Sequence, residues 1–179
     1  MESKTSLATN RISLLDKSHA LWKEHLSSKD LVIDATCGNG HDTLFLASLG
    51  VQVIAYDIQE AAIQVTAKRV EGYPNVTLKH ASHENFDEQG AKLIVYNLGY
   101  LPGSDKKTTT RLESTLRSLE SAKKTLADGG ALSIICYPGH EEGARESEAV
   151  EAWAKAQKCT LTTIRSPSPF LLFLRQFPS

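Results

Sequence analysis

Apolar positions along this chain recur with two spacings, which alternate from one segment to the next. Short runs of consecutive apolar and β-branched residues are typical of strands covered on both faces, and they predict strands at 31–35, 51–57, 76–81, 92–99, 131–139, 159–166 and 170–177. Apolar residues three or four positions apart are typical of amphipathic helices, and they predict helices at 13–26, 41–50, 59–70, 111–130 and 142–158. The alternation predicts an α/β fold with a doubly wound, mostly parallel sheet, helices on both faces and a closing pair of strands.

The amino-acid totals are ordinary for one soluble globular domain spanning residues 1–179. Apolar residues make up 41% of the chain, and no apolar run approaches the roughly 18 residues of a membrane span. Three cysteines without metal-ligand spacing, and an N-terminus without an apolar signal segment, predict a cytoplasmic protein with free thiols. A net charge of -1 argues against bulk electrostatic binding of nucleic acid but permits a local basic patch.

Candidate functional residues are expected just after the strands. In a doubly wound sheet, ligands bind outside the carboxyl ends of the strands, near the point where the strand order reverses. The segments in that position are 34–42, 57–59, 82–83, 97–102 and 137–140.

The segment DATCGNGHDT, residues 34–43, turns through two glycines between a strand and a helix. Gly38 and Gly40 would let the backbone approach a ligand closely, and the next helix would direct its free N–H groups at that ligand. Asp57 follows Gly40 by 17 residues at the end of the next strand, where a carboxylate can accept both hydroxyl hydrogens of a ribose. This pattern favours a nucleoside site, and the alternative is a plain β–α turn with a solvent-facing Asp57.

Asp34 indicates which nucleoside is bound. A dinucleotide-binding fingerprint has a third glycine where this chain has Thr43, so a nicotinamide-dependent oxidoreductase is disfavoured. An acid before the turn suits a cofactor with a positive amino group, such as the methionine portion of S-adenosylmethionine. The arrangement resembles the first motif of class I methyltransferases, D-x-G-x-G-x-G, with Thr36 in place of the first glycine.

The segment YNLGYLP, residues 96–102, places Asn97 at the end of the fourth predicted strand. Aminomethyltransferases that act on nitrogen carry a similar loop, with Asp or Asn followed by two prolines and an aromatic residue; this chain matches at Asn97 and Tyr100 but not at the prolines. An amide oxygen there can accept a hydrogen bond from a substrate amine and orient its lone pair, so catalysis would be mostly positioning. The alternative is a strand-terminating turn in which Asn97 satisfies nearby backbone groups.

Weaker signals follow the third and fifth strands. Ser82 and His83 stand where class I methyltransferases contact adenine, although an ordinary loop histidine explains the pattern equally well. Tyr137 and His140 fall on the substrate side, where Tyr137 could stack on a base, but turn chemistry would also account for both. The sequence shows no Cys-x-x-Cys, carboxylate–histidine metal cluster or nucleophile elbow, so no metal is expected.

Four motifs in order, DATCGNGHDTLFLA, YDIQ, YNLGYLPGSDK and YPGH, resemble the tRNA 5-aminomethyl-2-thiouridine methyltransferase family, whose members were once labelled "putative rRNA methylases". The resemblance spans about residues 10–178 and implies a class I methyltransferase fold, a seven-stranded Rossmann-like sheet. It also implies an S-adenosylmethionine-dependent N-methyltransferase that converts 5-aminomethyl-(2-thio)uridine to 5-methylaminomethyl-(2-thio)uridine at wobble position 34 of tRNA.

The resemblance assigns residues to the parts of the cofactor. The turn Cys37, Gly38, Asn39 and Gly40 would contact it, with Asp57 and Gln59 at the ribose and Ser82 and His83 at the adenine. Asn97 is the implied catalytic residue, and no general base is assigned, because a primary amine with a pKa slightly above neutral can lose its proton to water.

The segment GSDKKTTTR, residues 103–111, offers a route to RNA binding. Lys106 and Lys107 could bind phosphates of a tRNA anticodon stem-loop while the wobble base is splayed out, although a solvated loop is the alternative. A homodimer would supply further surface. The other functions that remain open are methylation of rRNA or of a small-molecule amine, and a non-catalytic module that binds S-adenosylmethionine or RNA.

Overall fold

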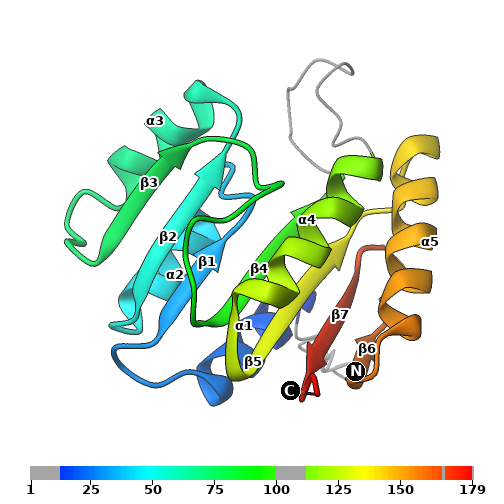
Figure 1. The fold of residues 1–179 in the computed structure, drawn as a ribbon. Coiled ribbons are helices and arrows are strands. Elements are labelled where there is room, and N and C mark those ends of the chain that lie inside the picture. Colours follow the sequence, from blue (N-terminus) through cyan, green and yellow to red (C-terminus); the bar gives the residue numbers. More distant parts are fainter. Residues whose placement is uncertain (1–12, 100–111, 167, 179) are drawn as a thin grey trace, which may run out of the picture.

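A computed structural model describes residues 13–99, 112–166 and 168–178. Within these residues, seven strands form a single sheet with the order β3-β2-β1-β4-β5-β7-β6 (Figure 1). The strands are β1 (Leu31–Asp34), β2 (Gln52–Asp57), β3 (Val76–His80), β4 (Ala91–Leu98), β5 (Leu126–Cys136), β6 (Thr160–Ile164) and β7 (Phe170–Arg175). Strands β1 to β5 are parallel, and β7 is antiparallel to both of its neighbours. The predicted doubly wound sheet with a closing strand pair is confirmed.

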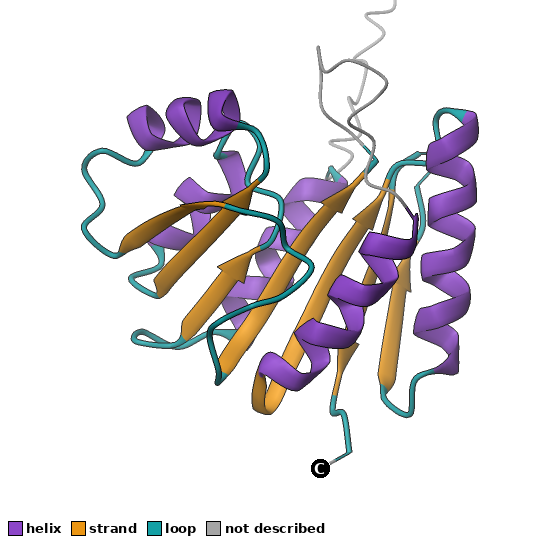
Figure 2. Ribbon diagram, turned by 45° about the horizontal axis from the view of Figure 1, so that its top comes forward, coloured by secondary structure: helices purple, strands orange, loops and turns teal. Residues whose placement is uncertain are grey.

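Five helices in the described residues cover the two faces of the sheet (Figure 2). They are α1 (Leu14–His25), α2 (His41–Ser48), α3 (Glu60–Arg69), α4 (Leu112–Thr125) and α5 (Glu141–Ala156). Successive residues of one strand enter different cores because side chains alternate across a sheet. Val32 packs in a cluster with Trp22 of α1 and Leu46 of α2, whereas Ile33 packs in a cluster that contains residues of α4 and α5. This double burial explains why central strands such as β1 and β7 are nearly continuous apolar runs.

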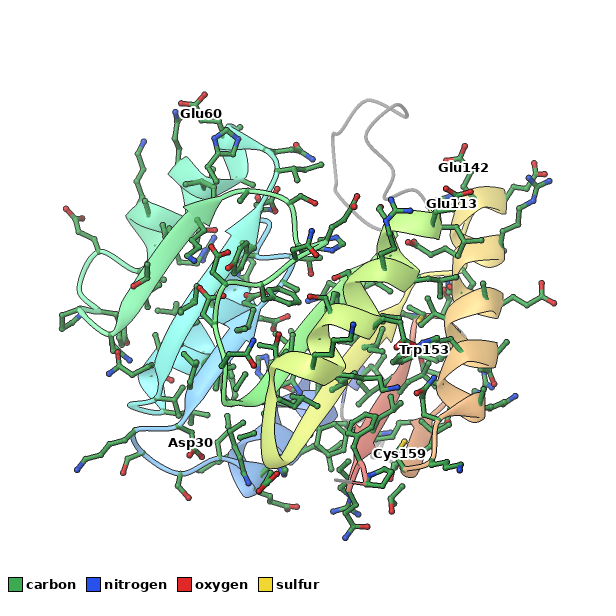
Figure 3. The ribbon with its side chains drawn as sticks, in the orientation of Figure 1. Asp30, Glu60, Glu113, Glu142, Trp153 and Cys159 are labelled. Atoms are coloured by element: carbon green, nitrogen blue, oxygen red, sulfur yellow. The ribbon has the colours of Figure 1, made fainter. Side chains whose placement is uncertain are left out.

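Two residues near the C-terminal end of the sequence cover the edge of the core that contains α4 and α5. Trp153 and Cys159, which Figure 3 labels, are partly buried and pack against this core. On the opposite face, the indole Nε1 of Trp22 donates a 2.8 Å hydrogen bond to the Ser133 hydroxyl of β5, which fixes α1 to the middle of the sheet. No helix in the described ranges is long and apolar enough to cross a membrane.

The predicted helix at 111–130 is wrong at its C-terminal end. The helix ends at Thr125, and β5 begins with Leu126, which pairs with Ala91 at the start of β4. The register then shifts, so that Leu93 pairs with Ala131. Gly129 adopts a φ of 67°, which an L side chain rarely adopts, so this part of the strand bulges. Gly129 and Gly130, which lie at the end of the predicted helix, are therefore part of an irregular strand.

The chain crosses from the β3 edge back to β4, next to β1, and this reversal places the switch point between β1 and β4. The carboxyl ends of β1, β2 and β4 all lie at the upper edge in Figure 1. The turn after β1 and the residues at the end of β4 therefore come together at this edge.

Candidate active site

The turn between β1 and α2 is held in place by its neighbours. Gly38 and Gly40 adopt φ values of 50° and 77°. A Cβ on Gly40 would lie 2.7 Å from the Thr66 hydroxyl of α3, whereas a Cβ on Gly38 would meet nothing within 4 Å. The Thr66 hydroxyl also donates a 3.0 Å hydrogen bond to the Gly38 carbonyl. Gly40 is therefore packed against α3, and Gly38 borders open space in which a ligand could approach the backbone.

The remaining predicted turn residues have backbone roles in the structure. Cys37 is buried, and its backbone N–H donates to the Tyr56 carbonyl at 2.9 Å. The Asn39 carbonyl accepts a 2.7 Å hydrogen bond from Arg69 Nε. These contacts fix the path of the turn and leave the predicted cofactor contacts of both residues as predictions.

Asp57 lies at the end of β2, directly beside the turn. Its Oδ2 accepts from the Gly38 N–H and its Oδ1 accepts from the Gln59 N–H, both at 2.9 Å. Each carboxylate oxygen has a second lone pair, so these bonds leave acceptor capacity for two ribose hydroxyls. The alternative of a solvent-facing Asp57 does not hold, because the residue is 7% exposed.

Asp34 is fully buried at the end of β1. Its Oδ2 accepts a 2.7 Å hydrogen bond from the Thr43 hydroxyl, and its Oδ1 accepts a 3.3 Å hydrogen bond from the Thr36 N–H. Burial raises the pKa of Asp34 to about 7, and the negative charge of Asp42 is the second largest cause of this increase. The predicted interaction of Asp34 with a positive amino group remains a prediction, because the contacts of both carboxylate oxygens in the structure are to Thr36 and Thr43.

The raised pKa of Asp34 predicts a pH-dependent stability. The pKa of the Asp34 carboxyl is ordinarily 3.8 and is about 7 in the folded protein, so the unfolded chain releases the carboxyl proton at a lower pH than the folded protein does. The stability that the protonated Asp34 carboxyl contributes is fully present below about pH 4 and is lost as the pH rises from about 4 to about 7. At 1.4 kcal/mol per pKa unit, the free energy of unfolding falls by up to about 4 kcal/mol over this range. Urea unfolding at several pH values should show that Asp34→Asn removes this fall in the free energy of unfolding with rising pH. Asp87→Asn, at an exposed carboxylate, should keep it. Equal slopes in wild type and Asp34→Asn would contradict the assignment.

Asn97 lies at the end of β4 and contacts two residues of the turn and its helix. Its backbone N–H donates to the Thr36 hydroxyl at 2.7 Å, so Thr36, which stands where the class I methyltransferase motif has its first glycine, joins the turn to β4. Its side-chain Nδ2 donates to Asp42 Oδ2 at 2.7 Å. The other carboxylate oxygen of Asp42 lies 2.8 Å from His19 Nε2. The structure thus joins His19, Asp42 and Asn97 in one hydrogen-bonded group.

Two members of this group were missed as functional residues. Asp42 falls inside the segment expected at the strand ends, and its place directly after the glycine turn is the signal that could have found it. His19 comes from α1, 23 residues earlier than Asp42 in the chain, and nothing in its local sequence indicates that it reaches this edge.

His140 caps a helix in the structure. Its Nδ1 accepts a 3.1 Å hydrogen bond from the Gly143 N–H at the start of α5, and its Nε2 lies 3.0 Å from the Gly99 carbonyl. Both ring nitrogens therefore contact backbone groups, which agrees with the alternative that His140 only stabilises the turn. A substrate-binding role for His140 stays a prediction. Tyr137 is half-buried beside β4, where its N–H donates to the Leu98 carbonyl. The predicted substrate-binding residues Tyr100, Lys106 and Lys107 lie outside the described residues.

Known proteins resemble this chain in sequence and in fold. The model of the family described as "Putative rRNA methylase" matches residues 53–166. A chloroplastic tRNA (mnm(5)s(2)U34)-methyltransferase of Arabidopsis thaliana is 33% identical over 88% of this chain and 67% of its own.

The chain belongs to this rRNA methylase family.

Two solved structures share the fold of this chain. A "putative rRNA-methylase" from Clostridium thermocellum has a TM-score of 0.84 and 34% identity over 91% of this chain and 97% of its own. A "putative methyltransferase" from Streptococcus mutans, solved with S-adenosylhomocysteine, has a TM-score of 0.82 and 30% identity over the same shares. The class I fold is thereby confirmed, and the chain is an S-adenosylmethionine-dependent methyltransferase.

The predicted cofactor residues of this methylase fit a nucleoside. Among the described residues, two buried side-chain nitrogens lack a hydrogen-bond partner, Gln59 Nε2 and His83 Nδ1. Buried polar groups are nearly always paired, so two such atoms in a predicted cofactor site favour a polar ligand there. Burial lowers the pKa of His83, which therefore offers a neutral ring. Ser82 is exposed next to it and accepts a hydrogen bond from the Glu84 N–H at 3.2 Å.

A metal site is not evident in the part of the chain that the structure describes. No group of three or more His, Cys, Asp or Glu side chains in the described residues could hold a metal ion. The acids of the site are instead engaged by hydroxyl, amide, imidazole and backbone donors.

Proposed function

We propose that this methylase transfers a methyl group to the aminomethyl nitrogen of 5-aminomethyl-(2-thio)uridine at wobble position 34 of tRNA. The product is 5-methylaminomethyl-(2-thio)uridine. The observation that carries the proposal is the oriented amide of Asn97 at the end of β4. S-adenosylmethionine, when bound, supplies a sulfonium methyl group that a nitrogen lone pair can take.

The contact between Asn97 and Asp42 determines what the amide can offer a substrate. An ionised carboxylate only accepts hydrogen bonds, so the Asn97 group that faces Asp42 is the NH₂ group. The amide oxygen is then the end available to a substrate, and it is a pure acceptor. A primary amine has N–H groups to donate to this oxygen, and one such bond fixes the direction of its lone pair. This supports methylation of nitrogen and requires no general base.

The choice of tRNA is supported by a relative and by charge. The Arabidopsis relative is named for a tRNA nucleoside at position 34. The first turns of α3, α4 and α5 carry the acids Glu60, Glu113 and Glu142, which point outward along the upper edge in Figure 3. A polyanion at this edge needs nearby cations, and the segment that follows Asn97 contains Lys106 and Lys107.

Replacing Lys106 and Lys107 with alanine should weaken tRNA binding and reduce its salt dependence. Two lost phosphate contacts would lower the slope of log affinity against log salt by roughly 1 to 2. S-adenosylhomocysteine binding should not change. Lys17→Ala with Lys23→Ala, at exposed positions of α1, removes the same charge and is the matched control. Filter-binding titrations at several salt concentrations measure both, and equal slopes in wild type and the Lys106/Lys107 variant would dismiss the role of this segment.

The other functions differ from the proposal in measurable ways. Methylation of rRNA is favoured by the description of the family, whereas the Lys106–Lys107 pair favours a polyanion over a small-molecule amine. The retained contacts of Asp57 and Asn97 speak against a non-catalytic module. A homodimer would enlarge the RNA-binding surface, and light scattering of the protein with and without tRNA tests it. Fractionation tests the proposed cytoplasmic location, which differs from the chloroplast of the plant relative.

The proposed reaction is tested on tRNA from cells that lack the corresponding methyltransferase. The purified protein is incubated with S-adenosylmethionine and this tRNA. The tRNA is then digested to nucleosides, whose masses are measured by mass spectrometry. We expect 5-aminomethyl-2-thiouridine to become its N-methyl derivative. An unchanged nucleoside, with the protein still binding S-adenosylhomocysteine, would overturn the proposed substrate and retain the cofactor.

A further inference from the structure

We propose that Asp42 is a positioning residue that acts on methyl transfer through Asn97, and that His19 holds Asp42 in place. This inference rests on the proposed function, because it concerns how Asn97 receives the substrate amine. It assigns a task to two residues that neither cofactor binding nor the predicted substrate contacts explain.

Asp42 is built into the site by three elements. It lies in the first turn of α2, where the helix dipole stabilises a negative charge, and it is 8% exposed. One carboxylate oxygen accepts from Asn97 of β4 at 2.7 Å, and the other lies 2.8 Å from His19 of α1. Both oxygens therefore have fixed partners, and the carboxylate cannot rotate without losing one of them.

His19 is itself held in position. Its ring stacks on Phe45 of α2 with a centroid distance of 3.7 Å and an interplanar angle of 7°. Because Asp42 accepts, His19 Nε2 must carry the hydrogen of their contact. This assigns a donor to one oxygen of Asp42 and leaves the other oxygen to Asn97.

The first effect of Asp42 is on the orientation of the amide. An asparagine side chain can present either its oxygen or its NH₂ group to a substrate, and these differ by a half-turn about one bond. Asp42 stabilises the orientation in which the NH₂ group is turned inward and the oxygen is the free acceptor. With asparagine at position 42, only one of the two carboxylate positions remains an oxygen. When that oxygen faces His19, the new NH₂ group faces Asn97 and favours the opposite orientation of its amide.

The second effect of Asp42 is on charge. As the N–CH₃ bond forms and the C–S electron pair returns to sulfur, the substrate nitrogen becomes a secondary ammonium, which later gives its extra proton to water. A carboxylate bonded to the Asn97 NH₂ group polarises the amide and makes its oxygen a stronger acceptor for the charged N–H. The acceptor is in place before reaction, so it stabilises the developing charge without reorganisation.

A double-mutant cycle of Asp42→Asn and Asn97→Ala tests the proposal. Single-turnover rates are measured with the aminomethyl tRNA, together with S-adenosylhomocysteine affinity and melting temperature. Asp42→Asn should slow the wild-type enzyme by about 10- to 100-fold, as removal of the hydrogen-bond partners that orient metal ligands does in metalloenzymes. In the Asn97→Ala background it should change the rate by no more than about 2-fold, because the group through which it acts is gone. Asp87→Asn makes the same chemical change at a carboxylate that is 90% exposed and should leave the rate unaltered.

The outcomes separate this inference from the proposed function. If wild type methylates the tRNA and Asp42→Asn is as fast, the positioning role is overturned while the function stands. If Asp42→Asn slows both backgrounds equally, Asp42 acts independently of Asn97 and the inference also fails. If wild type leaves the tRNA unmodified, the proposed function fails and the inference fails with it. A loss of rate that Asp42→Asn causes only in the enzyme that retains Asn97, with unchanged S-adenosylhomocysteine affinity and melting temperature, supports the inference.

Discussion

Asn97→Ala is expected to lower the rate of tRNA methylation by about 100-fold or more while leaving S-adenosylhomocysteine affinity nearly unchanged. The side-chain amide is held by Asp42, and the amide oxygen is the acceptor proposed for the substrate amine. The backbone N–H that joins β4 to the turn is retained in the variant, because it does not depend on the side chain. The expected loss is therefore in the rate of the methyl-transfer step, measured by single-turnover kinetics, because the missing contact orients the reacting nitrogen.

Asn85→Ala is the matched control for this prediction. Asn85 is an exposed asparagine in the connection between β3 and β4, and its truncation should leave the rate at the wild-type level. A fall in cofactor affinity as large as the fall in rate would show that Asn97→Ala disturbs the turn. A wild-type rate in Asn97→Ala would contradict the proposed role of the amide.

Gly40→Ala is expected to have the largest effect on stability, about 2 to 5 kcal/mol. A left-handed φ of 77° costs an L residue about 1 to 2 kcal/mol, and overpacking adds about 1 to 3 kcal/mol. The added Cβ would lie 2.7 Å from the Thr66 hydroxyl and 3.0 Å from its Cα, so a change of side-chain rotamer cannot remove the whole clash. The turn must move away from α3, and S-adenosylhomocysteine affinity should fall with it. Urea unfolding and calorimetric titration measure the two effects.

Two other glycines separate the causes. Gly38→Ala meets no atom within 4 Å but keeps a φ of 50°, so it should show the conformational cost alone. Gly72→Ala meets neither obstacle and should be close to neutral. Adding Thr66→Ala to Gly40→Ala should recover part of the overpacking cost. Equal stability of the Gly40 and Gly72 variants would show that the turn is not packed as described.

The order of helices and strands was predictable in large part because the central strands, such as β1, β4 and β7, are buried on both faces. Continuous apolar runs such as 92–99 have no other simple explanation in a chain that alternates with helical patterns. The end of α4 was not predictable in the same way. Leu126 continues the apolar spacing of the helix, yet pairing with Ala91 places it in β5. Local spacing could not reveal this, because the partner lies 35 residues away in the sequence.

The candidate site was predictable where its residues directly follow strands. Asp57 was placed by its distance from the glycine turn, and the structure brings it to the Gly38 N–H. The pairing of Asp42 with Asn97 depends on two strand ends meeting across the switch point, and His19 joins them from α1. Such contacts between distant segments are set by packing and leave no local pattern in the sequence.

The most direct test of the central claim offers two RNAs to the enzyme in one reaction. Transfer RNA and ribosomal RNA from cells lacking the corresponding methyltransferase are mixed with S-adenosylmethionine that carries a trideuterated methyl group. The two RNAs are then separated and digested to nucleosides, and the nucleoside masses are measured by mass spectrometry. We expect the label in 5-methylaminomethyl-2-thiouridine from tRNA and none in the ribosomal RNA. Label in a ribosomal nucleoside, with the wobble nucleoside of tRNA unlabelled, would contradict the account.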